Sequence, residues 1–386
     1  WPGAANMIMG IATAHFTSSP ILAISGGILT KQAGRGQLQE TSRAETSTDQ
    51  NYTQALQPFT KKVWDIQQPI RTAEIIRKAF AIAQADRPGA VAIEYPWDLQ
   101  AEYFDNPDDS KVPECYAYGR GIRADYKALE RAADYLCPAE CPVLVAGNGA
   151  MIGEAHSEIV ALAELIGAPV AMSFVAKGII PEDHPLSVGM VGWLGHPVAH
   201  EIIREHADIV FAIGYRFSDE ATSWWTEGHP YVKENRFIQI DIQQQELAKS
   251  YPVEVGLLGD ATATLQELID MIRARGGRQE SQNSRAWISD INKFLKLDLP
   301  DAEKMPMEPM VIADRLRQIL PRDSILSIDT GTHAHYFSAF YPIYGPRLFL
   351  NPGGGHRWGG AQWLFLGLNL GLLKKIAYPS QATVDF

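Results

Sequence analysis

The sequence is poor in cysteine, carries no excess of basic residues and has no apolar run long enough to cross a membrane. Only Cys115, Cys137 and Cys141 occur in 386 residues, and the spacing of the last two fits neither a redox pair nor a zinc knuckle. The formal net charge of −11 repels nucleic acids and anionic membranes. The most apolar run, at 363–373, is about half of the roughly 20 residues that a membrane span needs. We therefore expect a cytoplasmic protein with no nucleic-acid or membrane partner.

The usual motifs of nucleophilic, metal-dependent and phosphate-transfer enzymes are also lacking. The sequence contains no G-x-S-x-G, no P-loop and no H-E-x-x-H, and no cysteine has a plausible histidine partner. His333 and His335 suggest a metal site, but residues two apart do not share a helical face, and no third ligand is near. We expect no metal ligand in this chain, and any catalysis has to come from a bound cofactor.

Short apolar strands alternate with amphipathic helices along the whole chain, a pattern typical of parallel sheets covered on both faces. With 46% hydrophobic residues in 386, the chain is long enough for two or three cores. We expect an α/β fold with three doubly wound parallel-sheet domains, of which the first and third are incomplete. The expected boundaries are 1–105 for the first domain, 106–122 for a linker, 123–275 for the central domain, 276–305 for a second linker and 306–386 for the third domain.

Candidate ligand-binding residues follow the expected strands of the central domain, because open α/β sheets bind ligands beyond the carboxyl ends of their strands. In "VLVAGNGAMIGEA", Gly147 and Gly149 lie between a strand and a helix, where glycine lets backbone amides approach a phosphate. Their spacing is not the full dinucleotide fingerprint, so a tight turn is an equal alternative. The other candidates are Gly214, Arg216, Asp219, Asp241 and Asp260. Each aspartate has a plain alternative as a helix or turn cap, and the arginine as a surface ion-pair partner.

Two segments of the third domain could bind a diphosphate or a flat ligand. In "IDTGTHAHYF", Gly331, Thr332 and His333 follow a strand and offer a small residue, a hydroxyl and an imidazole. "PGGGHRWGG" supplies several glycines, with Trp358 among them, that could wrap a flat ligand. A flexible loop would suit the same composition.

Together these segments resemble the thiamine-diphosphate enzymes of the acetolactate synthase family. "PGAANMIMGIATAHFTSSPILAISGG" resembles the family's P-G-x-x-N…S-x-P-x-x-x-x-x-G segment, and "GQLQET" resembles its F-Q-E-T. "KGIIPEDHPLSVGMVGWLG" is similar to its central G-x-x-P-x-x-H-P…G-M-x-G-x-x-G. "DTGTHAHYFSAFY" and "GGGHRWGG" resemble D-x-G-x-H and G-G-x-G-x-M-G of its diphosphate-binding domain. The motifs occur in order over nearly the whole chain, which makes the match far more specific than any one of them.

The resemblance implies a set of cofactor-binding residues. Pro2 and Asn6 would lie beside the pyrimidine of thiamine diphosphate, and Gln39 would face the reacting carbon. Around the other end of the cofactor, the implied residues are Gly331, His333, Gly354 and Gly359, with Trp358 in place of the family's Met. In acetolactate synthases the middle domain binds FAD, and the corresponding positions here are Gly147, Gly149, Gly192, Gly214, Arg216, Asp219, Asp241 and Asp260.

The resemblance also implies an activity: decarboxylation of a 2-oxo acid with thiamine diphosphate and Mg²⁺, carboligation to a second carbonyl compound, and a place in branched-chain amino acid biosynthesis. The enzyme would be a homodimer or homotetramer, because one site combines domains of two chains in this family. Glu220 and Trp97 stand where the family has Arg and Lys, so a sulfoacetaldehyde acetyltransferase or another thiamine-diphosphate decarboxylase is an alternative. A non-catalytic nucleotide-binding or structural relative is another.

Two motifs of the family fall outside the sequence. Its activating glutamate would precede Trp1, and its magnesium-binding G-D-G…N-N motif would follow Phe386. We therefore expect the sequence to correspond to the middle of such an enzyme and to be inactive alone.

Overall fold

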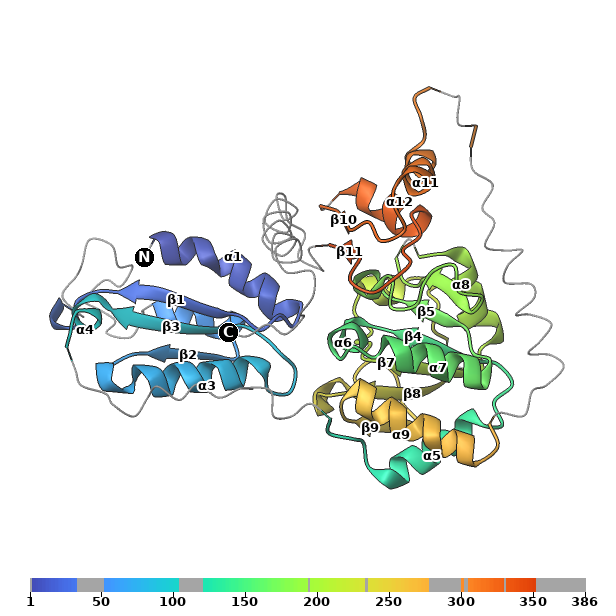
Figure 1. Ribbon diagram of the computed structural model, residues 1–386, viewed down its shortest axis with the longest axis horizontal. Coiled ribbons are helices and arrows are strands. Elements are labelled where there is room, and N and C mark those ends of the chain that lie inside the picture. Colours follow the sequence, from blue (N-terminus) through green and yellow to red (C-terminus); the bar gives the residue numbers. More distant parts are fainter. Residues whose placement is uncertain are drawn as a thin grey trace. The chain divides into compact units, whose positions relative to one another are not determined.

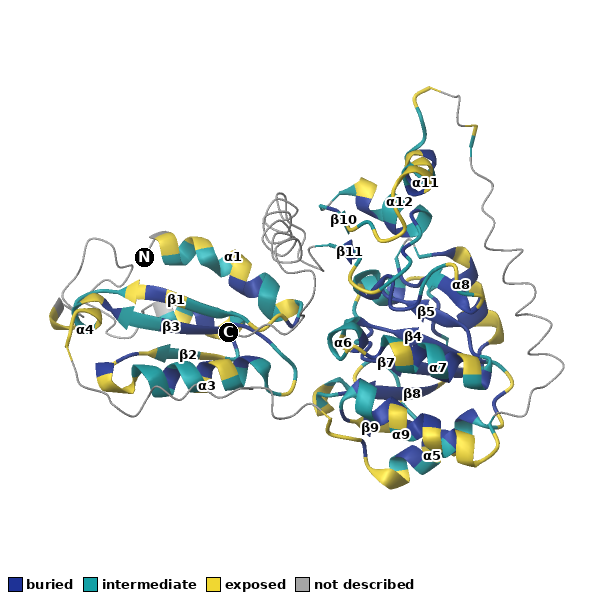
Figure 2. Cartoon of the chain, in the orientation of Figure 1, coloured by how far each residue is buried: buried dark blue, intermediate teal, exposed yellow. Residues whose placement is uncertain are grey.

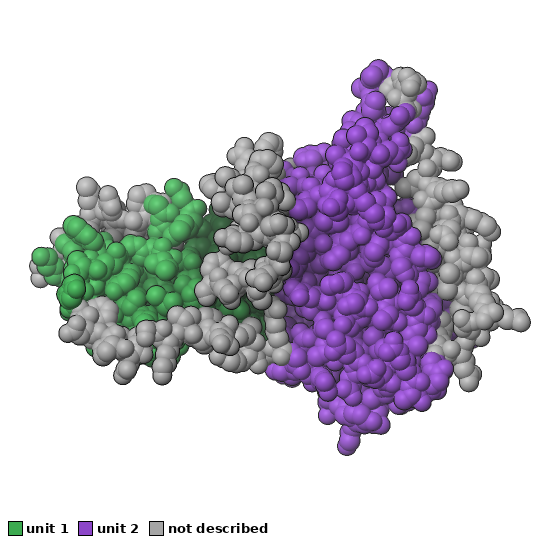
Figure 3. All heavy atoms as spheres, in the orientation of Figure 1, with its two compact units in different colours: residues 1–120, 353–355 green, residues 121–352, 356–386 purple. Residues whose placement is uncertain are grey.

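The computed structural model describes residues 2–32, 52–103, 121–193, 195–232, 235–277, 300–301, 305–329 and 331–351. The chain forms two compact units, one within residues 1–120 and one within residues 121–352 (Figure 3). The sheets of both units are parallel throughout (Figure 1), which confirms the expected α/β class. Much of both expected linkers lies outside the described residues, so the boundaries of the three domains stay predictions.

The first unit is built on a three-stranded sheet in the order β1-β3-β2. Val91 and Ile93 of the central strand pack in one cluster with Ile75 and Ala79 of α3, whereas Ala90 and Ala92 belong to a cluster on the other face. Successive side chains of a strand point to opposite faces, so the two clusters cover both sides of β3. The elements are α1 (Pro2–Phe16), β1 (Leu22–Gly27), η1 (Thr30–Gln32), α2 (Tyr52–Leu56), η2 (Gln57–Phe59), β2 (Lys62–Asp65), η3 (Pro69–Arg71), α3 (Thr72–Gln84), β3 (Val91–Pro96) and α4 (Trp97–Gln100).

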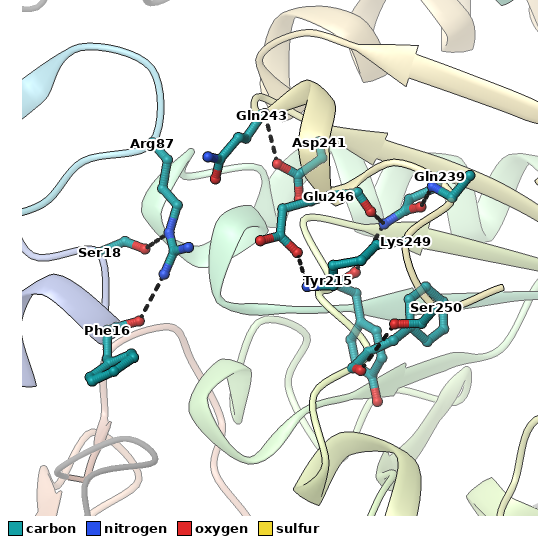
Figure 4. Close-up of polar contacts among 12 residues, drawn as sticks. Phe16, Ser18, Arg87, Tyr215, Gln239, Asp241, Gln243, Glu246, Lys249 and Ser250 are labelled. Carbon is teal, nitrogen blue, oxygen red and sulfur yellow. Dashed lines mark hydrogen bonds and ion pairs between the residues drawn. The ribbon is translucent and has the colours of Figure 1, made fainter. Parts of the chain in front are cut away.

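Two cations satisfy carbonyl groups at the ends of helices in this unit. Lys61 Nζ donates to the carbonyl oxygens of Ala85 (2.5 Å) and Arg87 (2.9 Å), just beyond α3. The guanidinium of Arg87 donates to Phe16 O at 3.1 Å and to Ser18 Oγ at 2.8 Å, where α1 ends (Figure 4). Carbonyls at a helix C-terminus have no partner within the helix, and the partial negative charge there favours cations. Arg87 therefore has a structural role.

The second unit contains a six-stranded parallel sheet in the order β6-β5-β4-β7-β8-β9. Numbered along the sheet's own sequence this order is 3-2-1-4-5-6, the dinucleotide-binding arrangement. The elements up to the last strand are α5 (Tyr126–Leu136), β4 (Pro142–Ala146), α6 (Asn148–Ile152), α7 (His156–Ile166), β5 (Val170–Met172), η4 (Phe174–Ala176), β6 (Ser187–Met190), α8 (Pro197–Glu201), η5 (Ile202–His206), β7 (Ile209–Ile213), η6 (Glu220–Trp225), β8 (Arg236–Asp241), η7 (Gln244–Glu246) and β9 (Val255–Leu258).

Both faces of this sheet are buried (Figure 2). On β4, Leu144 and Ala146 pack in a cluster with α5, α7 and α9 (Ala261–Ala274), whereas Val143 and Val145 belong to a cluster with α8. Helices on both faces explain why the central strands are continuous apolar runs rather than alternating ones.

The remaining described elements of the second unit form a small layer with its own core. They are α11 (Pro309–Ile319), β10 (Leu326–Ser327), α12 (Thr332–Phe340) and β11 (Phe349–Leu350). β10 and β11 pair in parallel, and Ala313, Ala334, Tyr341 and Phe349 lie in one buried cluster. Across the described part of both units, no helix is long and apolar enough to cross a bilayer.

Candidate functional site

Three of the predicted glycines meet where the strand order of the large sheet reverses. β4 and β7 are the neighbouring strands at this point, Gly147 and Gly149 follow β4, and Gly214 follows β7. In open sheets of this kind the crevice beyond such a pair of strands is the ligand-binding place. The topology thus brings together residues that are about 65 positions apart in the sequence.

Backbone contact alone demands glycine at these positions. A Cβ on Gly147 would lie 2.2 Å from Gly214 O, and one on Gly149 would lie 2.8 Å from Gly214 Cα. The amides of Gly147 and Gly149 donate to Ile213 O at 2.9 Å and to Gly214 O at 3.0 Å. The alternative of a tight strand-to-helix turn therefore accounts for both residues, and their role as cofactor ligands stays a prediction.

The three candidate aspartates each accept a hydrogen bond from a nearby backbone amide. Asp241 ends β8 and is buried, and its carboxylate accepts from Gln243 N at 2.8 Å (Figure 4). Asp260 accepts from Ala263 N at 2.9 Å as the N-cap of α9, and Asp219 accepts from Glu220 N at 2.9 Å at the start of η6. Caps of this type stabilise helix and turn starts. The structure thus gives each aspartate the capping role that was its alternative.

Buried polar side chains shape the loops after β7 and β8. Gln239 is 1% exposed; its amide donates to Glu246 O at 3.1 Å and accepts from Ala248 N at 3.1 Å, which fixes the loop after β8 (Figure 4). Tyr215 OH donates to Ala221 O at 2.8 Å and accepts from Tyr231 OH at 2.8 Å. Burial raises the pKa of both tyrosines, so they are neutral. Arg216, the next residue, is half-buried.

The loop after β6 is held against η6 through Gly192. This residue has φ +109, and a Cβ on it would lie 2.6 Å from Glu220 O. The next amide, of Trp193, donates to Glu220 O at 2.7 Å. The His200 ring nitrogen Nε2 lies 3.1 Å from Gly192 N and 2.9 Å from Gly192 O. Burial lowers the pKa of His200, which favours a neutral ring here.

Three aromatic rings connect this loop with η6 and α12. The Trp193 ring lies 4.5 Å from that of Trp224 and 4.3 Å from that of His335, between ring centroids. Trp224 has φ 52, and its neighbours Ser223 and Trp225 have φ 53 and 51. Left-handed backbone is costly for such residues and persists only where the surrounding structure holds it. Packing against Trp193 is one contact that holds it.

Gly331 and His333 lie together at the exposed start of α12. Gly331 is the N-cap residue with φ +153, and a Cβ on it would lie 2.7 Å from the His333 ring. Thr332 and His333 are exposed on the first turn. A helix N-terminus carries partial positive charge and unpaired amides, so it favours a phosphate group. These residues fit the diphosphate role that the resemblance implies.

The structure shows little about the remaining predicted cofactor-binding residues. Pro2 and Asn6 lie on α1 of the first unit, where Asn6 is exposed. Gln39, Gly354, Trp358 and Gly359 lie outside the described residues. Within the described ranges no group of three His, Cys, Asp or Glu residues could hold a metal ion. A cavity of about 410 Å³ lies in the second unit, but none of the predicted residues lines it; its walls are His156, Ser157, Val160, Ala161, Glu164, Ile179, Pro181, Tyr344, Gly345 and Pro346.

Comparison with known proteins finds a family match over the central sheet and similarity to individual relatives over nearly the whole chain. Residues 129–268 match the family described as "Thiamine pyrophosphate enzyme, central domain". A probable acetolactate synthase large subunit from Methanococcus aeolicus is 32% identical over 92% of this chain and 59% of its own length. The corresponding protein from Methanocaldococcus jannaschii is 32% identical over 92% of this chain and 58% of its own.

The acetolactate synthase isozyme 3 large subunit of Escherichia coli is 27% identical over 99% of this chain and 64% of its own length. The chain thus spans about three fifths of the length of the relatives it matches. The relationship covers both units, the switch-point glycines and the start of α12. The chain is therefore related along nearly its whole length to acetolactate synthase large subunits, and its central part matches the central domain of thiamine pyrophosphate enzymes.

Proposed function

We propose that the protein containing this chain decarboxylates a 2-oxo acid with thiamine diphosphate and joins the remaining carbons to a second carbonyl compound. The names of its relatives support acetolactate synthesis over the other activities. The observation that carries the proposal is the exposed start of α12, where Gly331 and His333 fit a diphosphate in a chain of this family.

Each group of residues has a separate part in this proposal. Thiamine diphosphate, when bound, supplies the electron sink for the loss of carbon dioxide. Gly331 and His333 bind its diphosphate, Pro2 and Asn6 flank its pyrimidine, and Gln39 presents its amide to the reacting carbon. Gly354, Trp358 and Gly359 line the thiazolium.

We further propose a homodimer or homotetramer in which one site draws residues from two chains. The relatives' names support a small-molecule substrate and a large-subunit role. The low cysteine content supports a cytoplasmic location.

Gln39→Ala tests the catalytic part of this proposal in the complete natural protein. With pyruvate, thiamine diphosphate and Mg²⁺, kcat should fall on the order of 100-fold, because a donor aimed at developing charge acts mainly in the transition state. The dissociation constant of thiamine diphosphate should stay within about 2-fold, since Gln39 does not hold the diphosphate. Product formation and cofactor titration by tryptophan fluorescence measure the two quantities. An unchanged kcat removes Gln39 from the site.

The central sheet also supports FAD as a bound group without a redox role. The strand order suits a dinucleotide, and the residues that the resemblance implies for it are Gly147, Gly149, Gly192, Gly214, Arg216, Asp219, Asp241 and Asp260. The purified complete protein should then be yellow, with flavin absorbance near stoichiometric, and Arg216→Ala should lose most of it. A colourless protein that added FAD does not stabilise against heat would exclude FAD.

A further inference from the structure

A buried ion pair lies between the central sheet and the layer that carries α12. The Lys177 ammonium contacts the Glu182 carboxylate, and the two side chains are 1% and 12% exposed. Both residues belong to the "KGIIPEDHP" segment between η4 and β6. Removing two charges from water is costly unless each has close partners, so such a pair tolerates little displacement.

Glu182 is also bonded to the chain just beyond α12. Its backbone amide donates to Ile343 O at 2.9 Å, and its Oε1 accepts from Ile343 N at 3.2 Å. Ile343 is fully buried in the same cluster as Ala334 and Tyr341. The carboxylate therefore connects Lys177, on the central side, to the backbone at residue 343.

The neighbouring backbone leaves no room for this segment to shift. Gly178 has φ +87, and a Cβ on it would lie 2.4 Å from Gly345 O and 2.6 Å from Ile343 Cγ2. Asp183 forms an exposed ion pair with Arg322 at 2.7 Å. Lys177, Gly178, Glu182 and Asp183 thus hold the chain on both sides of α12.

We propose that Lys177 and Glu182 are positioning residues for diphosphate binding. By fixing the backbone at Ile343, they set the placement of α12 against the central sheet and so the orientation of Gly331 and His333 at its other end. This inference rests on the proposed binding of thiamine diphosphate. An apolar contact could shift when the ligand binds. A buried carboxylate bonded to both Lys177 and Ile343 N allows only one relative position of the two segments.

Glu182→Ala in the complete protein is the direct test, with Asp134→Asn as the matched control. Asp134 forms an exposed ion pair with Arg275 at 2.6 Å, away from α12 in the sequence and in its contacts. Glu182→Ala should raise the dissociation constant of thiamine diphosphate about 10-fold or more, as loss of an orienting partner commonly does, whereas kcat at saturating cofactor should change less than about 2-fold. The control should leave both unchanged.

Lys177→Met/Glu182→Gln supplies the rescue. Glutamine keeps an oxygen for Ile343 N, and no unpaired charge remains buried. We expect its cofactor affinity to return to within about 3-fold of the wild type. If Glu182→Ala does not fold, Lys177→Met/Glu182→Met, which leaves no buried charge and no acceptor for Ile343 N, takes its place in the comparison.

The outcomes separate this inference from the function on which it rests. A wild type that thiamine diphosphate neither stabilises nor activates overturns the proposed function, and the positioning role with it. A wild type that binds the cofactor, together with a Glu182→Ala variant that binds it equally well, overturns the positioning role alone. Equal losses in affinity for Glu182→Ala and the double variant would also overturn it.

Discussion

Gly147→Ala is expected to lower the free energy of unfolding of the second unit by about 3 kcal/mol, because the added methyl meets backbone rather than a movable side chain. Its Cβ would lie 2.2 Å from Gly214 O and 2.6 Å from Tyr215 Cα. The strands on both sides belong to the middle of the six-stranded sheet, so neither loop can withdraw without disturbing the core. Chemical unfolding in urea, followed by far-ultraviolet circular dichroism, measures the change.

Gly256→Ala is the control for this substitution. Gly256 lies on β9 of the same sheet, and its added Cβ would make ordinary contacts with side chains, Leu247 at 3.4 Å and Val253 at 3.9 Å. We expect a change within about 0.5 kcal/mol. Equal losses of stability in the two variants would show that the close approach of Gly147 to the Gly214 backbone does not require glycine at position 147.

Lys177→Met is expected to destabilise the second unit by about 3 kcal/mol at pH 8, because it leaves the Glu182 carboxylate buried without its cation. Burial raises the pKa of Glu182 above its ordinary value of 4.5, and Lys177 opposes that rise. Without Lys177 the folded-state pKa rises further. The folded protein then binds a proton that the unfolded chain has released, so the contribution of Glu182 to stability is fully present below pH 4.5 and is lost as the pH rises through the shifted pKa.

Urea unfolding of Lys177→Met and wild type across pH 4.5 to 8 measures this dependence. The loss in free energy of unfolding relative to the wild type should be smallest at the acidic end and grow with pH. Lys177→Met/Glu182→Gln removes the titrating group, and its deficit should not vary with pH. A deficit for Lys177→Met that is flat in pH would mean that Glu182 finds another cationic partner.

The strands buried on both faces are among those that the sequence predicts. Residues 142–146 and 209–213 form continuous apolar runs because helices cover both sides of the sheet. That their glycine-containing ends meet where the strand order reverses is known only from the fold. β2, with the sequence KVWD, was not predicted, because it is a half-exposed edge strand of four residues with charges at both ends.

The contacts that hold the site were harder to predict, because they join residues far apart in the sequence. Asp260 illustrates a local signal, since an aspartate before a helical stretch predicts an N-cap, and it is one. No such signal exists for Gln239 or for the bonds that join Lys177, Glu182 and Ile343. The sequence does not show which distant residue a buried polar group will bond to. The folded chain supplies those partners.

The central claim is that this chain forms part of a thiamine-diphosphate enzyme, and thermal unfolding of the complete natural protein tests it most directly. Ligand that binds the folded state alone stabilises it by about 2.7 kcal/mol at 100 times its dissociation constant. Thiamine diphosphate with Mg²⁺ should therefore raise Tm by several degrees, while thiamine with Mg²⁺ should not, because the diphosphate contacts at Gly331 and His333 carry much of the binding. A Tm that millimolar thiamine diphosphate and Mg²⁺ leave unchanged would contradict the account.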